Sequence, residues 1–512
     1  MLYFLAAIPI LSVLLFMILF RWGGHLAGSA GWAIGLIIAL IGFGLNFEVF
    51  WVSQVKSLFL SLFVLAILWP ALFLYHIVNQ TDGINAIANW LSSLIGNKSL
   101  LLLILAWAFS GLMEWIAGFG LPVAVVSPML VGLGIAPTAA VAAVAIGHAW
   151  SVTFGDLGVV YETLLGLVQI DEAILAAPTT IMMGIACLLC GLAVINVLKI
   201  RKFWPHVLII AGLMSSTLYL FVVTFDLIPL SMLAAGLSGI LGGILLGKIK
   251  TKSIKKNDEK RVLFDKKDPK SLKGLKCALF SYGILALLLS AINLIPALNQ
   301  ALMNIVWQMD FPEVITTLGN ITPAGKGAAI KPLLHPGTSM TLIAILSYLV
   351  FSSRGETARG DFISALKKTW NSAAPASLGV ISMVGLATIM EHCGMTFLLA
   401  KGLSDLMGSV FPAVSPLVGI LGAFATGSNN NSNVLFAPLQ YNAAILLGLN
   451  PGFLLASQTT GGALGSMIAP AKIIVGCSTT GLTGRDGDVL KITLPYGLAI
   501  GLIIGLLTLV FC

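Results

Sequence analysis

Residues 99–122 read SLLLLILAWAFSGLMEWIAGFGLP, and this stretch holds the two features that decide the fold. Its first part, up to Ala117, is an apolar run that is long enough to cross the hydrocarbon core of a bilayer as a helix. Its second part is rich in glycine and ends in a proline, which favours a break in the helix. Free backbone groups at that depth must face protein or a polar cavity, because lipid cannot pair with them. The stretch therefore predicts a membrane helix that is interrupted at a functional site.

The composition extends this interpretation to the whole chain. Of its 512 residues, 58% are hydrophobic and 9% are charged, and the mean hydropathy is +1.01. Soluble domains carry about 25% charged residues, and disordered chains need an excess of charge, so both classes are excluded. The sequence predicts an all-α polytopic membrane protein with about 12–14 transmembrane helices. The apolar runs lie near 3–20, 28–46, 57–78, 99–117, 137–155, 173–198, 205–225, 227–247, 277–297, 337–351, 373–391, 412–426, 451–470 and 489–512.

The distribution of charge predicts the orientation. Residues 248–276 hold twelve Lys and Arg against four acids, which accounts for the whole net charge of +8. A single basic loop between apolar runs indicates a cytoplasmic loop and argues against nucleic-acid binding. Two further basic clusters lie an even number of spans away, on the same side. They are Lys199, Arg201 and Lys202, and Arg354, Arg359, Lys367 and Lys368.

An internal repeat predicts two related halves. Residues 90–96 resemble residues 402–408, and Gly134-Ile135-Ala136-Pro137 matches Gly448-Leu449-Asn450-Pro451, at offsets of 312 and 314. We therefore divide the chain into a first repeat (1–247), the basic cytoplasmic loop (248–276) and a second repeat (277–512). The span count leaves open whether the repeats are inverted relative to each other.

Three further segments are not predicted to span the membrane. Residues 84–95 and 397–411 are amphipathic and are predicted to be helices at the membrane interface. The segment 299–336 is too polar to span, and its Pro and Gly residues predict broken, partly buried backbone.

Each half has one break that suits a re-entrant hairpin, at 114–122 and at 426–433. Secondary transporters bind substrate where paired broken helices meet near the midplane. The first break contributes Gly118, Phe119 and Gly120 as candidate substrate contacts. The second contributes a cluster of amides and hydroxyls that would be expensive to bury unpaired. The candidate substrate residues of the second half are Ser428, Asn429, Asn430, Asn431, Asn433, Thr459, Thr460 and Gly461.

Four ionisable residues lie deep in apolar sequence and are functional candidates for that reason. Glu114 precedes the first break, where loss of water would let its carboxyl hold a proton near neutrality, so we expect it to couple transport to protons. Asp156 is a second proton-coupling candidate. His148 and Lys472 are candidate substrate contacts. Because an offset of 314 places Lys472 two residues from the position of Asp156, we also expect these two to form a buried charge pair.

The same residues resemble the bacterial L-lactate permease family. The resemblance rests on Glu114 with Gly118-Phe119-Gly120-Leu121-Pro122-Val123-Ala124, on Thr426-Gly427-Ser428 with Ser432-Asn433, and on Thr459-Thr460-Gly461-Gly462 with Gly465 and Pro470. It implies a proton-coupled symporter of lactate, glycolate or a similar 2-hydroxy monocarboxylate in the inner membrane. The chain departs from the family pattern at Asn429, where Asp is typical, and at Trp115, where Gly is usual. His148, Asp156 and Lys472 stand where uncharged residues are expected.

The sequence thus predicts a secondary transporter whose partners are a small carboxylate, a coupling proton and membrane lipid. Within transport, the alternative is a carrier coupled to Na⁺ or selective for another organic anion. A passive channel is disfavoured because polar residues cluster at two breaks instead of lining several spans. No nucleotide loop, metal-ligand set or nucleophile–base pair stands out, so we expect no cofactor, no metal and no enzymatic turnover.

Overall fold

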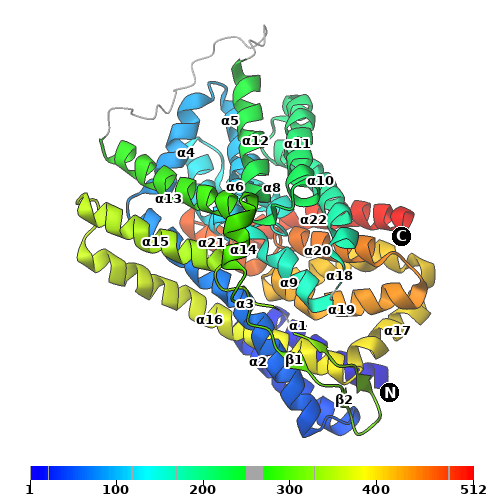
Figure 1. Cartoon of the computed structure of the whole chain (residues 1–512). Helices are drawn as coiled ribbons and strands as arrows, with labels where there is room; N and C mark the ends of the chain where they lie inside the picture. Colours follow the sequence, from blue (N-terminus) through cyan, green and yellow to red (C-terminus); the bar gives the residue numbers. More distant parts are fainter. Residues whose placement is uncertain are drawn as a thin grey trace.

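The computed structural model describes residues 2–20, 22–116, 120–168, 170–248, 269–327, 329–482 and 485–512. Within these residues, twelve helical stretches are long and apolar enough to cross a membrane. The secondary structure is almost entirely helical (Figure 1), which confirms the prediction of an all-α polytopic membrane protein. Most of the basic loop, residues 249–268, lies outside the described residues.

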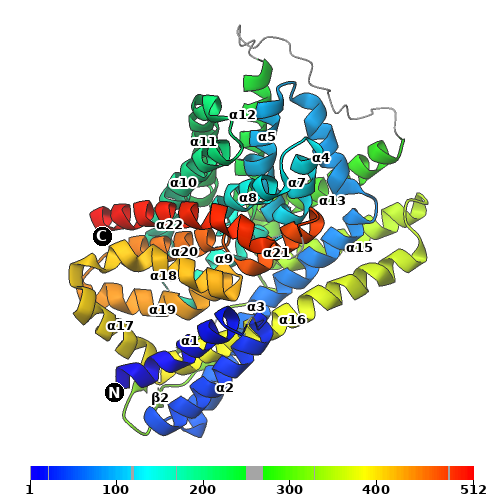
Figure 2. The ribbon, with the colours of Figure 1, turned by 180° about the vertical axis from the view of Figure 1, so that it is seen from behind.

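Four long helices form one unit, which we call the arm bundle and which runs diagonally in Figures 1 and 2. The long helix α16 packs along both α2 and α3, and α15 packs on α3. Gly35 of α2 has no side chain, and this lets Leu386 of α16 approach the α2 backbone closely, whereas Gly31 makes room for Val13 of α1 (Leu2–Ile18). The helices are α2 (Gly24–Gly42), α3 (Phe47–Asn79), α15 (Pro336–Ser353) and α16 (Arg359–His392).

A second unit, which we call the site bundle, holds most of the other helices. Its centre is formed by α10, α18 and α20, and α11, α12 and α22 pack around them. A π-helical turn at Leu105–Phe109 joins α5 to α6. The helices are α5 (Lys98–Ile104), α6 (Ser110–Ile116), α7 (Leu121–Gly132), α8 (Pro137–His148), α9 (Val159–Val168), α10 (Glu172–Val197), α11 (Trp204–Tyr219), α12 (Ile228–Lys248), α18 (Phe411–Thr426), α19 (Asn429–Leu447), α20 (Pro451–Gly465), α21 (Pro470–Thr479) and α22 (Asp486–Phe511).

The remaining helices lie at the edges of the two bundles. The segments predicted to be amphipathic are helical, as α4 (Gly83–Leu94) and α17 (Met395–Met407). Helix α13 packs on α4 and α15, and α1 packs on α2 and α17. The bounds of the other three are α1 (Leu2–Ile18), α13 (Pro269–Leu294) and α14 (Pro296–Leu302).

Two nested β-hairpins follow α14, and together they form what we call the hairpin segment, residues 310–326. The outer pair is β1 (Asp310–Phe311) with β4 (Gly325–Lys326), and the inner pair is β2 (Val314–Ile315) with β3 (Ile321–Thr322), both antiparallel. The segment rests on the loop before α3, where Thr317 N donates to Gly44 O over 2.8 Å. The expectation of broken backbone is correct here, but most residues of the segment are exposed and not partly buried. A short hairpin satisfies its own backbone groups and therefore needs no burial.

Helix α16 begins well before the predicted span at 373–391. The helix starts at Arg359 and includes Lys367 and Lys368, which the sequence analysis assigned to a loop. Charged residues lower the local hydropathy, although they can extend a helix beyond the hydrocarbon core. The end of the predicted span at 451–470 is also wrong, because α20 stops at Gly465.

The element bounds agree with the repeat offset at several points. Helices α10 and α22 each have 26 residues, and both their first and their last residues are 314 apart. Helices α8 and α20 both start at a proline, Pro137 and Pro451, again 314 apart. The turns before them contain Gly134 and Gly448, both with positive φ. The two-repeat organisation and the re-entrant hairpins stay predictions.

The packing of α22 on α18 yields a stability test. A Cβ at Gly505 would lie 2.1 Å from the Ala413 carbonyl oxygen, whereas a Cβ at Gly487 of the same helix would meet nothing within 4 Å. Gly505→Ala should therefore lower the free energy of unfolding by about 1–3 kcal/mol, the usual cost of overpacking. Thermal unfolding of the detergent-solubilised protein measures this, with Gly487→Ala as the control. Equal melting temperatures for the two variants would contradict the close packing of α22 on α18.

Candidate functional site

Two interrupted helices bring their broken ends to the middle of the molecule. In the first half, α6 ends at Ile116 and α7 begins after Gly120, whose φ is +86°. In the second half, α18 ends at Thr426, Gly427 has φ +75°, and Ser428 caps α19. Glycine adopts positive φ without strain, so the chain can turn sharply at both places. The predicted contacts Gly118 and Phe119 lie outside the described residues.

A second pair of breaks lies beside the first. After α8 the chain forms a short 3₁₀ turn at Asp156–Gly158, in which Asp156 has φ +47° and Leu157 has φ +60°. After α20 the chain forms a turn, and α21 starts at Pro470. Lys472 therefore sits in the first turn of α21. Positive φ at two consecutive non-glycine residues is strained and is retained only where the surroundings demand it.

These breaks surround a cavity of about 330 Å³, which we call the central cavity. The site bundle supplies Glu114, Asp156, the start of α19 and Lys472. The arm bundle supplies an opposite wall that is mostly apolar. The residues of that wall are Gly24, His25, Leu68, Pro375, Ala376, Gly379 and Val380. The cavity thus lies on the seam between the two bundles.

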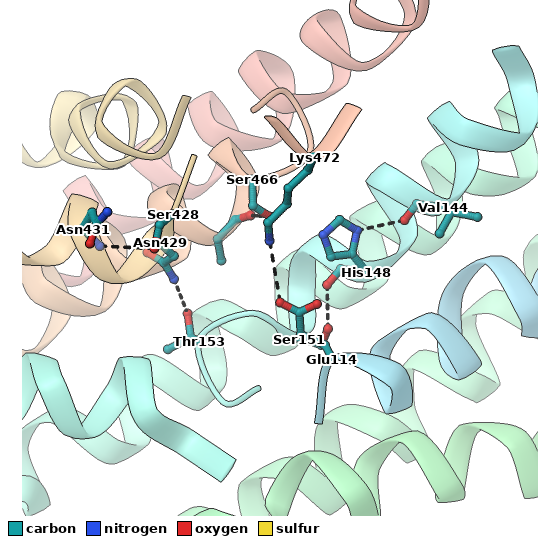
Figure 3. Close-up of polar contacts among 11 residues, drawn as sticks. Glu114, Val144, His148, Ser151, Thr153, Ser428, Asn429, Asn431, Ser466 and Lys472 are labelled. Atoms are coloured by element: carbon teal, nitrogen blue, oxygen red, sulfur yellow. Dashed lines mark hydrogen bonds and ion pairs between the residues drawn. The ribbon is translucent and has the colours of Figure 1, made fainter. Parts of the chain in front are cut away.

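Two of the charged groups that line the central cavity form a buried ion pair. Lys472 Nζ lies 3.7 Å from Glu114 Oε1, and the side chains are 8% and 2% exposed (Figure 3). The expectation that Lys472 pairs with Asp156 is wrong in its partner, although Asp156 lines the same cavity. Because a buried charge is stable only with a partner, the pair neutralises the centre of the site.

The start of α19 presents polar groups to the cavity. Asn429, Asn430 and Asn431 all line it, and Ser428 Oγ accepts a hydrogen bond from Asn431 N over 3.4 Å. The amide of Asn430 is buried, and neither its oxygen nor its nitrogen has a hydrogen-bond partner within the described part of the chain. A helix N-terminus attracts anions through its free N–H groups and its dipole. The donors of this wall therefore suit a negatively charged ligand.

A layer of hydrogen bonds behind the cavity holds Asn429 in place. Its Nδ2 donates to Thr153 Oγ1 over 3.2 Å, and Asn433 Nδ2 donates to Thr459 Oγ1 over 2.9 Å. The Asn429 oxygen lies against Gly462, where a Cβ would approach it to 2.0 Å. Three predicted substrate contacts lie in or beside this layer and do not line the cavity: Asn433, Thr459 and Thr460. The same holds for Gly461, which packs against Pro416.

Sequence reasoning missed Thr153, and two of its other candidates lie beside the central cavity without lining it. Thr153 follows Ser151 in an apolar run, and this pair of hydroxyls was the available signal. His148 is fully buried beside Lys472 but does not line the central cavity, and its Nδ1 bonds to Val144 O over 3.0 Å. Gly120 lines an adjoining cavity of about 290 Å³, which we call the inner cavity. The inner and central cavities share Leu68, Ala376 and Val475.

Comparison with known proteins identifies the family of this chain. The model of the family described as L-lactate permease matches residues 3–512, practically the whole chain. The chain belongs to the L-lactate permease family. This is a family of permeases and not of enzymes, and the chain is a multi-pass protein of the cell membrane.

Individual members of the L-lactate permease family resemble the chain along its full length. It is 26% identical to glycolate permease GlcA of Escherichia coli (strain K12) over 538 residues, which covers 98% of this chain and 94% of that protein. It is 27% identical to the L-lactate permease of Escherichia coli (strain K12) and 26% identical to that of Bacillus subtilis (strain 168), with the same two coverages. At this level of identity the chain is a divergent member of the L-lactate permease family.

The buried pair predicts a stability difference between two lysines. Lys472→Ala leaves the Glu114 carboxyl buried without its partner and should lower the free energy of unfolding by about 3–5 kcal/mol. The matched control is Lys491→Ala, because Lys491 pairs with Asp488 on the surface at 81% exposure and such pairs contribute at most about 1 kcal/mol. The double variant Glu114→Gln with Lys472→Gln should recover most of the loss. Equal thermal stability of Lys472→Ala and Lys491→Ala would refute the buried pair.

Proposed function

We propose that the protein is a secondary transporter that carries a small 2-hydroxy monocarboxylate, of the lactate and glycolate class, together with a proton. The observation that carries the proposal is the central cavity, where a buried lysine, a helix N-terminus and an unpartnered amide lie together with the carboxyl groups of Glu114 and Asp156. Further support comes from relatives that are named L-lactate permease and glycolate permease.

The binding step follows from the chemistry of the cavity. A carboxylate accepts hydrogen bonds from Lys472, from the α19 N-terminus and from the Asn430 amide, and bonds that involve a charged group are the stronger ones. The 2-hydroxyl of the substrate both donates and accepts, so it matches an amide that offers one donor group and one acceptor.

Proton coupling follows from competition for Lys472. In the empty site the ammonium neutralises Glu114 across 3.7 Å. When a substrate carboxylate takes over the ammonium, two negative groups share one cation in a place that water reaches poorly. Protonation of Glu114 restores neutrality, because an isolated charge in such a place is expensive. Substrate and proton then bind together, the proton on the Glu114 carboxyl and the substrate at Lys472. They cross the membrane as a pair that adds no net charge to the site.

Reconstitution tests this function directly. Proteoliposomes loaded with unlabelled L-lactate should take up labelled L-lactate by counterflow, and an inward pH gradient should drive its accumulation. Glu114→Gln should retain the counterflow but lose the accumulation, because an amide resembles the protonated carboxyl and cannot release a proton. Uphill accumulation by Glu114→Gln at the wild-type rate would disprove the proton-carrying role. Accumulation that follows a Na⁺ gradient instead would favour the Na⁺-coupled alternative.

The sign of the substrate charge can be tested at Asn430. Asn430→Ala should raise the apparent KM about 3- to 10-fold, which corresponds to the loss of one hydrogen bond of about 0.5–1.5 kcal/mol. Asn430→Asp should raise it further, because a second carboxylate then repels the anion. The comparison of the two variants is its own control, since a site for a cation would give the opposite order. An unchanged KM in both variants would place the substrate elsewhere.

A further inference from the structure

Three cavities follow one another along α3 and α16, on the seam between the two bundles. The inner cavity reaches His76 of α3, and the central cavity adjoins it at Leu68. A third cavity of about 390 Å³, which we call the outer cavity, lies at the opposite end of both helices, at Lys56 and His392. Helix α19 runs past two of the cavities, since Asn431 lines the central one and Tyr441 the outer one. The outer cavity therefore lies on the same path as the proposed substrate site.

The outer cavity opens on the side away from the basic end of α16. Asn320 of the hairpin segment donates to His392 O over 2.8 Å and fixes the hairpins to the last turn of α16. The first turns of α16 carry Arg359, Lys367 and Lys368, and 34 helical residues span about 50 Å. Because basic ends of spans stay in the cytoplasm, the outer cavity and the hairpin segment face the outside of the cell.

Positive charge dominates the polar lining of the outer cavity. Lys56 and Lys326 line it together with one acid, Glu391, and with His392. Lys56 interacts electrostatically with Glu391 and His392 but makes no ion pair with any residue that the structure describes. Its ammonium is therefore available to an incoming anion. Further hydrogen-bonding groups come from Asn320, Thr322, Tyr441 and Asn442.

An apolar contact separates the outer cavity from the central one. On α3, Leu60 lies between Lys56 and Leu68, and a Cβ at Gly166 of α9 would come within 3.2 Å of its Cδ1. The two helices thus meet closely between the cavities. The outer and central cavities have no lining residue in common, whereas the central and inner cavities share three.

We propose that the outer cavity is a second binding site, which captures the small carboxylate from outside the cell before it enters the central cavity. Lys56 is its principal cationic group and Lys326 lies at its rim. The proposal rests on the proposed function for the identity of the anion. The outer cavity would be a second site, separate from the one that the interrupted helices form around the central cavity.

The first test measures the external KM. In right-side-out membrane vesicles, Lys56→Gln should raise the apparent KM for labelled L-lactate influx about fivefold, the effect of removing a charge contact of about 1 kcal/mol in water. The KM for efflux should stay within about twofold of the wild-type value, because substrate that leaves the cell enters the protein from the inner cavity, which Lys56 does not line. Glu391→Gln should change the influx KM in the opposite direction. Lys491→Gln, remote from the cavity on α22, is the matched control.

The second test does not depend on transport. Lys326 is exposed at the rim, and of the native cysteines only Cys512 is not buried, so Lys326→Cys in a Cys512→Ser background offers one reactive thiol. An anionic methanethiosulfonate reagent should react faster than a cationic one. Adding Lys56→Gln should reduce this preference, and L-lactate should slow the anionic reagent. The folded state of each variant is checked by gel filtration, and Lys56→Met, which also removes the charge, replaces Lys56→Gln if the latter aggregates.

The outcomes separate the two proposals. Wild-type transport of L-lactate with an unchanged influx KM in Lys56→Gln overturns the outer site and leaves the proposed function intact. Failure of the wild type to transport any 2-hydroxy monocarboxylate overturns the proposed function. In that case the labelling experiment decides the outer site alone: protection by L-lactate supports it, and equal rates for both reagents with no protection overturn it.

Discussion

The ion pair between Lys472 and Glu114 is the interaction on which the centre of the molecule depends. Each break in a helix leaves backbone groups without partners, and lipid cannot supply them. The site bundle meets this constraint by turning the broken ends of α6, α19 and α21 toward one another around a polar cavity. A cavity of this kind would be unstable with one uncompensated charge, and the pair provides the compensation across 3.7 Å. The same neutrality makes the site sensitive to any anion that enters it.

The layer behind the cavity explains why an asparagine cluster is needed at this point of the chain. Asn429 is fixed from behind by Thr153, and its position requires the absence of a side chain at Gly462. Asn430, one residue further along the helix, lines the cavity, and its buried amide has no hydrogen-bond partner within the described part of the chain. Asn429 therefore fixes the start of α19 in place, and the amide of Asn430 is left available to bind a ligand. Hydrogen-bond donors that are fixed before the ligand arrives lose little entropy on binding.

The sequence was a good guide to most of the apolar runs and to the places where helices are interrupted, because each of these leaves a local signal. Hydropathy marks a span, and glycine or asparagine in an apolar run marks a break. The partner of Lys472 could not be predicted in this way. It depends on how α21 packs against α7 and α8, and a repeat offset records equivalence in the chain and not distance in space. The start of α16 was missed because Lys367 and Lys368 hide a continuous helix from a hydropathy scan.

The two walls of the central cavity differ in a way that bears on how such a site could be exposed to each side of a membrane in turn. With the exception of His25, the polar groups of the cavity belong to the site bundle, and the arm bundle offers a glycine-rich, apolar surface. A bound anion would therefore make its polar contacts almost entirely with the site bundle. If that bundle slid along the apolar surface of α3 and α16, the bound anion would keep all of its hydrogen bonds and would change only its van der Waals neighbours. The energy barrier to transport would then be set by the sliding of one bundle on the other and not by the strength of anion binding.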